Sequence, residues 1–119
     1  MNHTIFTIVV DDDPSVCRAL RRLLRSAGME VETYSSGENF LAAGLPREPD
    51  CLILDIRMPG MTGPELRDRL QALGRHLPIV FITAHAEDEE MAAGGSAIVL
   101  HKPFDDHTLL AAIERTTGA

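Results

Sequence analysis

The sequence predicts an α/β domain in which helices cover both faces of a doubly wound, five-stranded parallel sheet. Short runs rich in Val, Ile and Leu alternate with segments in which apolar residues recur at helical spacing. Most of the strand-like runs are continuous, which is typical of strands buried on both faces. The chain has 119 residues, a length that suits one compact domain.

Five short segments rich in β-branched and aliphatic residues are the predicted strands. The second segment, Glu30-Val31-Glu32-Thr33-Tyr34, alternates in polarity and is expected to be half-buried near an edge of the sheet. The third segment is apolar until its last residue, Asp55, and is soon followed by the turn Pro59-Gly60, which favours a buried central strand. The five predicted strands cover residues 5–10, 30–34, 51–55, 78–83 and 97–101.

Helix start signals follow the predicted strands. Asp13 before Pro14 predicts an N-cap with proline at the first helical position. Asp105 or Asp106 is expected to cap the last helix. Two capping-box patterns predict the starts of the second and third helices, and they are Ser35 with Glu38 and Thr62 with Glu65. Residues 84–95 predict a short fourth helix.

Apolar residues at helical spacing give each longer helix an inner stripe. The predicted inner residues are Val16, Cys17, Leu20, Leu23 and Leu24 in the first helix, Leu66, Leu70 and Leu73 in the third, and Leu109, Leu110 and Ile113 in the last. The first helix also carries a basic stripe, and it consists of Arg18, Arg21, Arg22 and Arg25. Such a stripe is either a solvated helix face or a docking surface for a partner.

Strands that alternate with helices require right-handed crossovers. The length and the strand count predict the flavodoxin-like (βα)5 arrangement with strand order 2-1-3-4-5. In this order the first, third, fourth and fifth strands are neighbours, and their carboxyl ends converge on one rim of the sheet. The residues at these ends are Asp11, Asp12, Asp55, Thr83 and Lys102.

The residues at this rim predict phosphoryl chemistry. Asp11, Asp12 and Asp55 would repel one another without a cation, and their oxygen atoms suit Mg²⁺. A lysine and a hydroxyl on the far side could hold phosphoryl oxygens, as in sites where catalysis is mostly positioning and charge neutralisation. Asp55 ends the central strand and is therefore the candidate nucleophile, which would form an acyl phosphate.

Composition excludes other classes of function. The formal net charge of −7 argues against direct nucleic-acid binding by this domain, because phosphate contacts need a basic face. No apolar run approaches the roughly 20 residues of a membrane helix, so no membrane association is expected. Cys17 and Cys51 lie in apolar contexts and are predicted to be free thiols, which favours a cytoplasmic setting.

Four segments give the chain a specific resemblance. Val10-Asp11-Asp12-Asp13-Pro14, Leu54 to Gly63, Thr83-Ala84 and Lys102-Pro103-Phe104 resemble a response-regulator receiver domain. The resemblance covers nearly the whole chain, residues 1–119, as a single receiver domain, with any output domain outside it. It is strongest to FixJ-like receivers, which precede a LuxR-type helix-turn-helix domain. It implies a signalling switch with a transcriptional output, not a turnover enzyme.

The same resemblance implies roles for the rim residues. Asp55 would accept a phosphoryl group from a sensor histidine kinase. Mg²⁺ would be bound by Asp12, Asp55 and the backbone carbonyl of Arg57, and by Asp11 directly or through water. Lys102 would pair with the phosphoryl group, and its peptide bond to Pro103 would be cis. Thr83 would be the switch hydroxyl that moves toward the phosphoryl group.

Two positions depart from the family pattern. Val99 stands where receivers usually carry Phe or Tyr as a rotameric switch, three residues before the lysine. The stretch from Thr83 to Lys102 is also about one helical turn shorter than usual, which predicts a shortened fourth helix. In this family the fourth helix, fifth strand and fifth helix form the output and dimer face, so atypical dimerisation is expected.

Two other classes of protein are alternatives for these residues, and each lacks support at one position. A haloacid-dehalogenase-type, Mg²⁺-dependent phosphatase would also use Asp55 as nucleophile, but it typically needs a second aspartate where this chain has Arg57. A flavodoxin-like electron carrier would need a phosphate-binding loop after the first strand. The acidic run Asp11-Asp12-Asp13 stands there and would repel the phosphate of a flavin mononucleotide.

Overall fold

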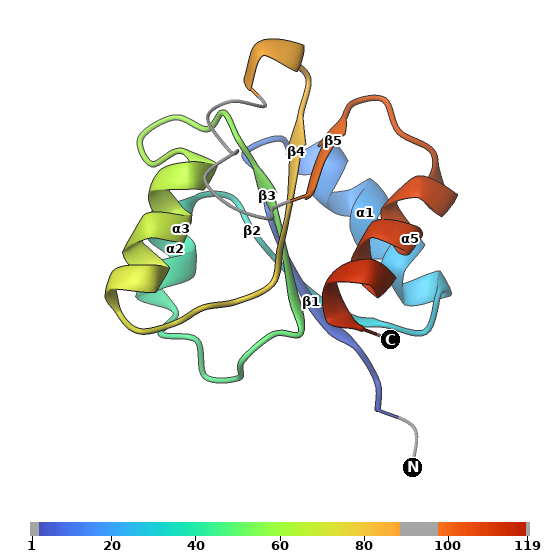
Figure 1. Cartoon of the computed structure of the whole chain (residues 1–119), viewed down its shortest axis with the longest axis horizontal. Coiled ribbons are helices and arrows are strands. Elements are labelled where there is room, and N and C mark those ends of the chain that lie inside the picture. Colours follow the sequence, from blue (N-terminus) through green and yellow to red (C-terminus); the bar gives the residue numbers. More distant parts are fainter. Residues whose placement is uncertain (1–2, 89–97, 119) are drawn as a thin grey trace.

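A five-stranded parallel sheet forms the centre of the molecule (Figure 1), and its strand order is β2-β1-β3-β4-β5. The computed structural model describes residues 3–88 and 98–118. The predicted fold class and strand order are confirmed. The strands are β1 (Phe6–Val10), β2 (Glu30–Tyr34), β3 (Cys51–Asp55), β4 (Ile79–Thr83) and β5 (Ile98–His101), and the helices are α1 (Pro14–Ser26), α2 (Gly37–Ala42), α3 (Gly63–Ala72), α5 (Asp106–Thr117) and the 3₁₀ turn η1 (Ala86–Asp88).

The helices cover the sheet on both sides, with α2 and α3 on one face and α1 and α5 on the other (Figure 1). Successive side chains of a strand point to opposite faces, so each central strand contributes to two apolar clusters. Leu52 and Leu54 of β3 belong to the cluster under α2 and α3, whereas Cys51 and Ile53 belong to the cluster under α1 and α5. Every residue of β1 and β3 is buried, which explains why both strands are apolar apart from Thr7 and Asp55.

Side-chain caps fix where most helices begin. The Asp13 side chain accepts a hydrogen bond from the Ser15 backbone N–H at the start of α1. Thr62 and Glu65 form a complete capping box at the start of α3, as the sequence predicts. Asp105, rather than Asp106, caps α5. These contacts satisfy backbone donors that the helices cannot satisfy themselves.

Two predictions about the helices were wrong. The N-cap of α2 is Ser36, whose side chain accepts from the Asn39 backbone N–H, and not Ser35. The helical spacing predicts Leu73 on the inner stripe of α3, yet Leu73 is 69% exposed. It lies at the C-cap position, where the chain leaves the helical path before Gly74, so the stripe ends at Leu70.

The other predictions about helices, strands and cysteines agree with the described residues, apart from the region of the fourth helix. β2 is an edge strand with partly exposed residues, and Cys17 and Cys51 are free thiols. The predicted fourth helix over residues 84–95 falls largely outside the described residues, and the part within them contains η1. None of the described helices is both long and apolar enough to cross a membrane.

Candidate functional site

The carboxyl ends of four neighbouring strands bring the predicted site residues to one rim of the sheet. Val10 is paired with Leu54, so the residues that follow them, Asp11 and Asp55, lie beside each other. The β3–β4 register pairs Asp55 with Ile82 and therefore places Thr83 one residue further along the rim. The backbone N–H of Lys102 donates to the carbonyl of Thr83 at 2.7 Å, which fixes the start of the next loop.

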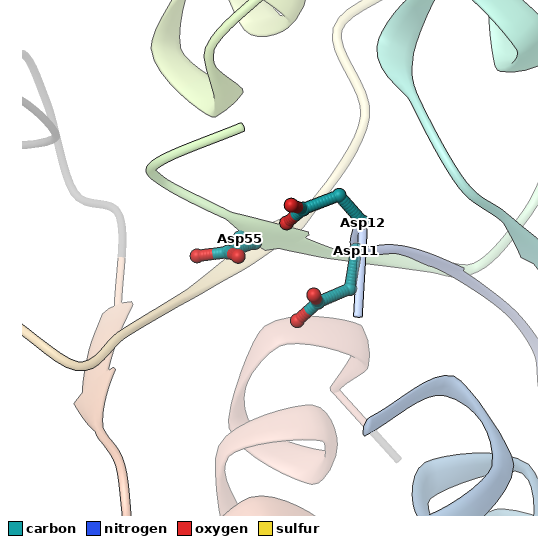
Figure 2. Close-up of side chains that lie close together, drawn as sticks. All are labelled: Asp11, Asp12 and Asp55. Atoms are coloured by element: carbon teal, nitrogen blue, oxygen red, sulfur yellow. The ribbon is translucent and has the colours of Figure 1, made fainter. Parts of the chain in front are cut away.

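Three carboxylates lie together at this rim (Figure 2). Asp11, Asp12 and Asp55 each offer an oxygen atom, and these atoms lie within 4.8 Å of one another. Asp11 is 1% exposed and Asp55 is 7% exposed, whereas Asp12 is open to solvent. Two buried acids and one exposed acid form a hard, oxygen-only donor set that is open on one side. This arrangement fits Mg²⁺, which keeps several waters and binds few carboxylates.

Lys102 supplies the positive charge at the rim. Its Nζ donates to Asp11 Oδ2 at 3.1 Å and lies 3.8 Å from Asp55 Oδ2. The peptide bond between Lys102 and Pro103 is cis, as the family resemblance implies. The two Nζ distances place the ammonium group between the two buried carboxylates, where it can also bind an anion attached to Asp55.

The Asp55 carboxyl is strongly perturbed by its surroundings. Burial, followed by the negative charge of Asp11, raises its pKa from 3.8 to about 7. The positive charge of Lys102 and the backbone N–H of Arg57 act in the opposite direction. A cation at this rim would favour the ionised form of Asp55, which is the form able to act as a nucleophile.

Thr83 is fully buried, and its hydroxyl is held by a network that the sequence did not indicate. Thr83 Oγ1 donates to Asp88 Oδ2 at 3.0 Å and accepts from the His85 backbone N–H at 3.0 Å. Asp88 also accepts two hydrogen bonds from the guanidinium group of Arg57, at 2.8 and 3.0 Å. Asp88 lies in an acidic run, Glu87 to Glu90, in which the sequence offers no way to choose one member.

Val99 stands in β5 where the family pattern has an aromatic ring. It is half-buried and packs against the apolar cluster that contains Phe81. An isopropyl group has no ring to swing between a buried and an exposed position. At this position β5 therefore has no side chain that could act as the rotameric switch of the family pattern.

Replacing Gly63 with alanine is expected to destabilise the domain by about 2–3 kcal/mol. A Cβ atom there would lie 2.5 Å from the backbone oxygen of Asp55 and 3.2 Å from the Cα of Ile56, and backbone atoms cannot move aside cheaply. Gly37→Ala is the control, because its Cβ would meet the flexible Met61 side chain at 3.0 Å. Urea unfolding measures both, and an equal loss in the two variants would contradict the expected backbone clash.

Comparison with known proteins places the chain in one family. Residues 7–114 match the family described as the response regulator receiver domain. The transcriptional regulatory protein FixJ of Azorhizobium caulinodans is 39% identical over 113 residues, which cover 92% of this chain and 54% of FixJ. The response regulator protein TodT of Pseudomonas putida is 41% identical over 109 residues, which cover 88% of this chain and 48% of TodT. The chain thus spans about half the length of these curated relatives.

A solved structure agrees with this placement over nearly its full length. The crystal structure of a response regulator receiver protein from Burkholderia phymatum superimposes with a TM-score of 0.82 at 44% identity. The match covers 97% of this chain and 96% of that one. The strand order, the acidic rim and these matches agree, and the chain belongs to the family of response regulator receiver domains.

Proposed function

We propose that this domain is a phosphorylation-dependent signalling switch in which Asp55 accepts a phosphoryl group from a sensor histidine kinase. The observation that carries the proposal is the meeting of Asp11, Asp12 and Asp55 with Lys102 at one rim. Receiver domains are signalling domains rather than classical enzymes, and Arg57 occupies the position where a phosphatase would need an acid. The domain would catalyse only its own phosphorylation and dephosphorylation.

Each rim residue has a role in this proposal. An ionised Asp55 oxygen attacks the phosphorus of the donor, the bond from phosphorus to the leaving group breaks, and the leaving group keeps the electron pair. Lys102 pairs with the new phosphoryl oxygens, because its Nζ already lies 3.8 Å from Asp55 Oδ2. The Thr83 hydroxyl then turns toward the phosphoryl group.

Asp12, Asp55 and the backbone carbonyl of Arg57 would hold Mg²⁺, with Asp11 binding directly or through water. When bound, Mg²⁺ neutralises the clustered carboxylates and the charge on the transferred group. The proposal is tested by incubating the domain with Mg²⁺ and acetyl phosphate. A gain of one phosphoryl group in the intact mass is expected, and no gain from either this donor or a kinase would contradict the proposal.

The proposed transcriptional output is supported by the names and lengths of the related proteins. FixJ is named a transcriptional regulatory protein, and it is about twice as long as the matched region. We therefore assign residues 1–119 to one receiver domain that controls a transcriptional output. The output would come from a LuxR-type helix-turn-helix domain outside this chain. The receiver itself would contact no nucleic acid and would act in the cytoplasm.

The basic stripe on α1 is expected to dock the kinase. Arg18 and Arg22 are exposed on a helix that begins beside the acidic rim, on a domain of net charge −7. The double substitution Arg18→Glu and Arg22→Glu reverses the charge of this stripe. It should slow phosphoryl transfer from the kinase about tenfold, because the new glutamates would repel the acidic kinase surface that the arginines attract. Arg69→Glu with Arg75→Glu is the matched control near the opposite face. Phosphorylation by acetyl phosphate should not change, and an unchanged kinase rate would contradict docking through α1.

Phosphorylation-dependent dimerisation is expected to be weak. The output and dimer face of the family combines the fourth helix with β5 and α5, and Val99 in β5 has no ring that could report on Thr83. Sedimentation velocity with and without beryllofluoride, a phosphoryl mimic, measures this. A tight dimer formed only with the mimic would contradict the expectation.

A further inference from the structure

Arg57, Asp88 and Thr83 form a hydrogen-bonded chain beside the phosphoacceptor. Asp88 is 2% exposed, so its carboxylate needs partners inside the protein. Arg57 donates to both of its oxygens, and the Thr83 hydroxyl donates to Oδ2. Its ion pair with the Arg57 guanidinium group, at 2.8 Å, indicates that this carboxylate is ionised. The acceptor that holds Thr83 is therefore a full negative charge.

The Thr83 hydroxyl has one proton to donate. Its donor distance to Asp88 Oδ2 is 3.0 Å, whereas the carbonyl of His85 lies at 3.3 Å. A hydrogen bond to an ionised acceptor is roughly twice as strong as one between neutral groups. A phosphoryl group on Asp55 is also anionic and needs the same donor. The two acceptors therefore compete for one proton.

Arg57 connects this competition to Asp55. Its backbone N–H interacts with the Asp55 carboxylate, and its side chain donates two hydrogen bonds to the Asp88 carboxylate. The guanidinium group is half exposed, with 51% of the side chain accessible, while the carboxylate it binds is almost fully enclosed. One residue thus contacts both the phosphoacceptor and the group that restrains the switch hydroxyl.

We propose that Asp88 is a positioning residue that restrains the Thr83 hydroxyl in the unphosphorylated domain and competes with the phosphoryl group on Asp55 for it. This inference rests on the proposed function and adds its regulation. The free energy needed to break the hydrogen bond between Thr83 and Asp88 determines how readily the phosphorylated conformation forms. It also gives the domain a restraint on Thr83 that does not depend on an aromatic ring at the position of Val99.

The test measures the affinity of the domain for beryllofluoride, in the presence of Mg²⁺, by NMR titration. Asp88→Asn should bind this mimic about fivefold more tightly, because a neutral acceptor holds the hydroxyl less strongly. Glu87→Gln is the matched control, since it removes one charge at the adjacent position, where the carboxylate is 69% exposed and lies 3.3 Å from Arg57. No comparable gain is expected from it.

A double-mutant cycle separates positioning of Thr83 from a general structural effect. In a Thr83→Ala background the hydroxyl is absent, so Asp88→Asn should no longer change the affinity. Amide hydrogen exchange gives a second readout without the mimic, because the His85 N–H donates to Thr83 Oγ1. Asp88→Asn should speed exchange of this amide more than Glu87→Gln does. If Asp88→Asn does not fold, Asp88→Ser takes its place in every measurement.

The outcomes are distinguishable. Equal affinities for Asp88→Asn and Glu87→Gln, or a gain that persists without the Thr83 hydroxyl, would overturn the restraint and leave the proposed function standing. Unchanged exchange at His85 would overturn it as well. Failure of the unsubstituted domain to bind beryllofluoride, together with failure to become phosphorylated, would overturn the proposed function and the restraint with it.

Discussion

Replacing Asp55 with asparagine is expected to abolish phosphoryl incorporation from acetyl phosphate and from the kinase. The amide keeps the shape of the side chain at the end of β3 but lacks the carboxylate oxygen proposed to attack phosphorus. Incorporation should fall from one group per chain to none, a loss of at least about 100-fold in rate. Intact mass spectrometry after a timed incubation with Mg²⁺ measures it.

The control for this substitution is another acid-to-amide change. Asp68→Asn removes one charge from α3, where the Asp68 side chain is 68% exposed and away from the rim. This variant should incorporate one phosphoryl group at the rate of the unsubstituted chain. Full incorporation into Asp55→Asn would show that another side chain is the acceptor and would contradict the role proposed for Asp55.

Without Mg²⁺, the free energy of unfolding of the domain is expected to fall as the pH rises from about 4 to about 7, because the buried Asp55 carboxyl must then ionise. Burial, followed by the charge of Asp11, raises its pKa from 3.8 to about 7. Between these values the folded domain keeps a proton that the unfolded chain has released, so the free energy of unfolding decreases with rising pH. The full difference corresponds to about 4 kcal/mol, which screening by solvent at the rim reduces to roughly 2 kcal/mol.

Asp55→Asn isolates this contribution because asparagine does not titrate. Its gain in the free energy of unfolding over the unsubstituted chain should grow from near zero at about pH 4 to its full value above about pH 7. Acids with lowered pKa values, such as Asp50 and Asp105, act in the opposite direction in both proteins and cancel in the difference. Urea unfolding across the range measures it, and a gain independent of pH would contradict the raised pKa.

Added Mg²⁺ should counteract the loss of stability that the domain shows as the pH rises. A cation binds the ionised carboxylates, so added Mg²⁺ should raise the melting temperature more at about pH 8 than at about pH 5. The Asp55→Asn variant should show a smaller rise at the higher pH. Equal rises in the two proteins would mean that Mg²⁺ does not bind through Asp55.

The sequence predicts the sheet and its rim well because these follow from strong local patterns. Asp55 follows a run of four apolar residues, and the strand order then determines which strand ends meet it. Thr62 and Glu65 could be recognised as a capping box because both partners are close in sequence. Local patterns therefore suffice where the contact itself is local or where topology brings strand ends together.

Other features depend on contacts that no local pattern reveals. The capping-box spacing to Glu38 favours Ser35, but the path of the chain makes the adjacent Ser36 the N-cap of α2. Leu73 continues the helical spacing of α3 but comes after the helix has ended. Asp88 pairs with Arg57 across 31 positions in a run of similar acids, so its partner is defined only by the folded structure.

The rim draws on residues that are far apart in the order of synthesis. Lys102 and Asp11, which share a hydrogen bond, are separated by 91 positions, and every strand pair in the sheet is parallel and non-local. A chain emerging from the ribosome therefore exposes Asp55 before Lys102 has left the ribosome. Such a chain lacks the ammonium group that would receive the phosphoryl oxygens. Under the proposed function, phosphorylation would therefore require a nearly complete domain, and a partly made chain would not divert phosphoryl groups from finished ones.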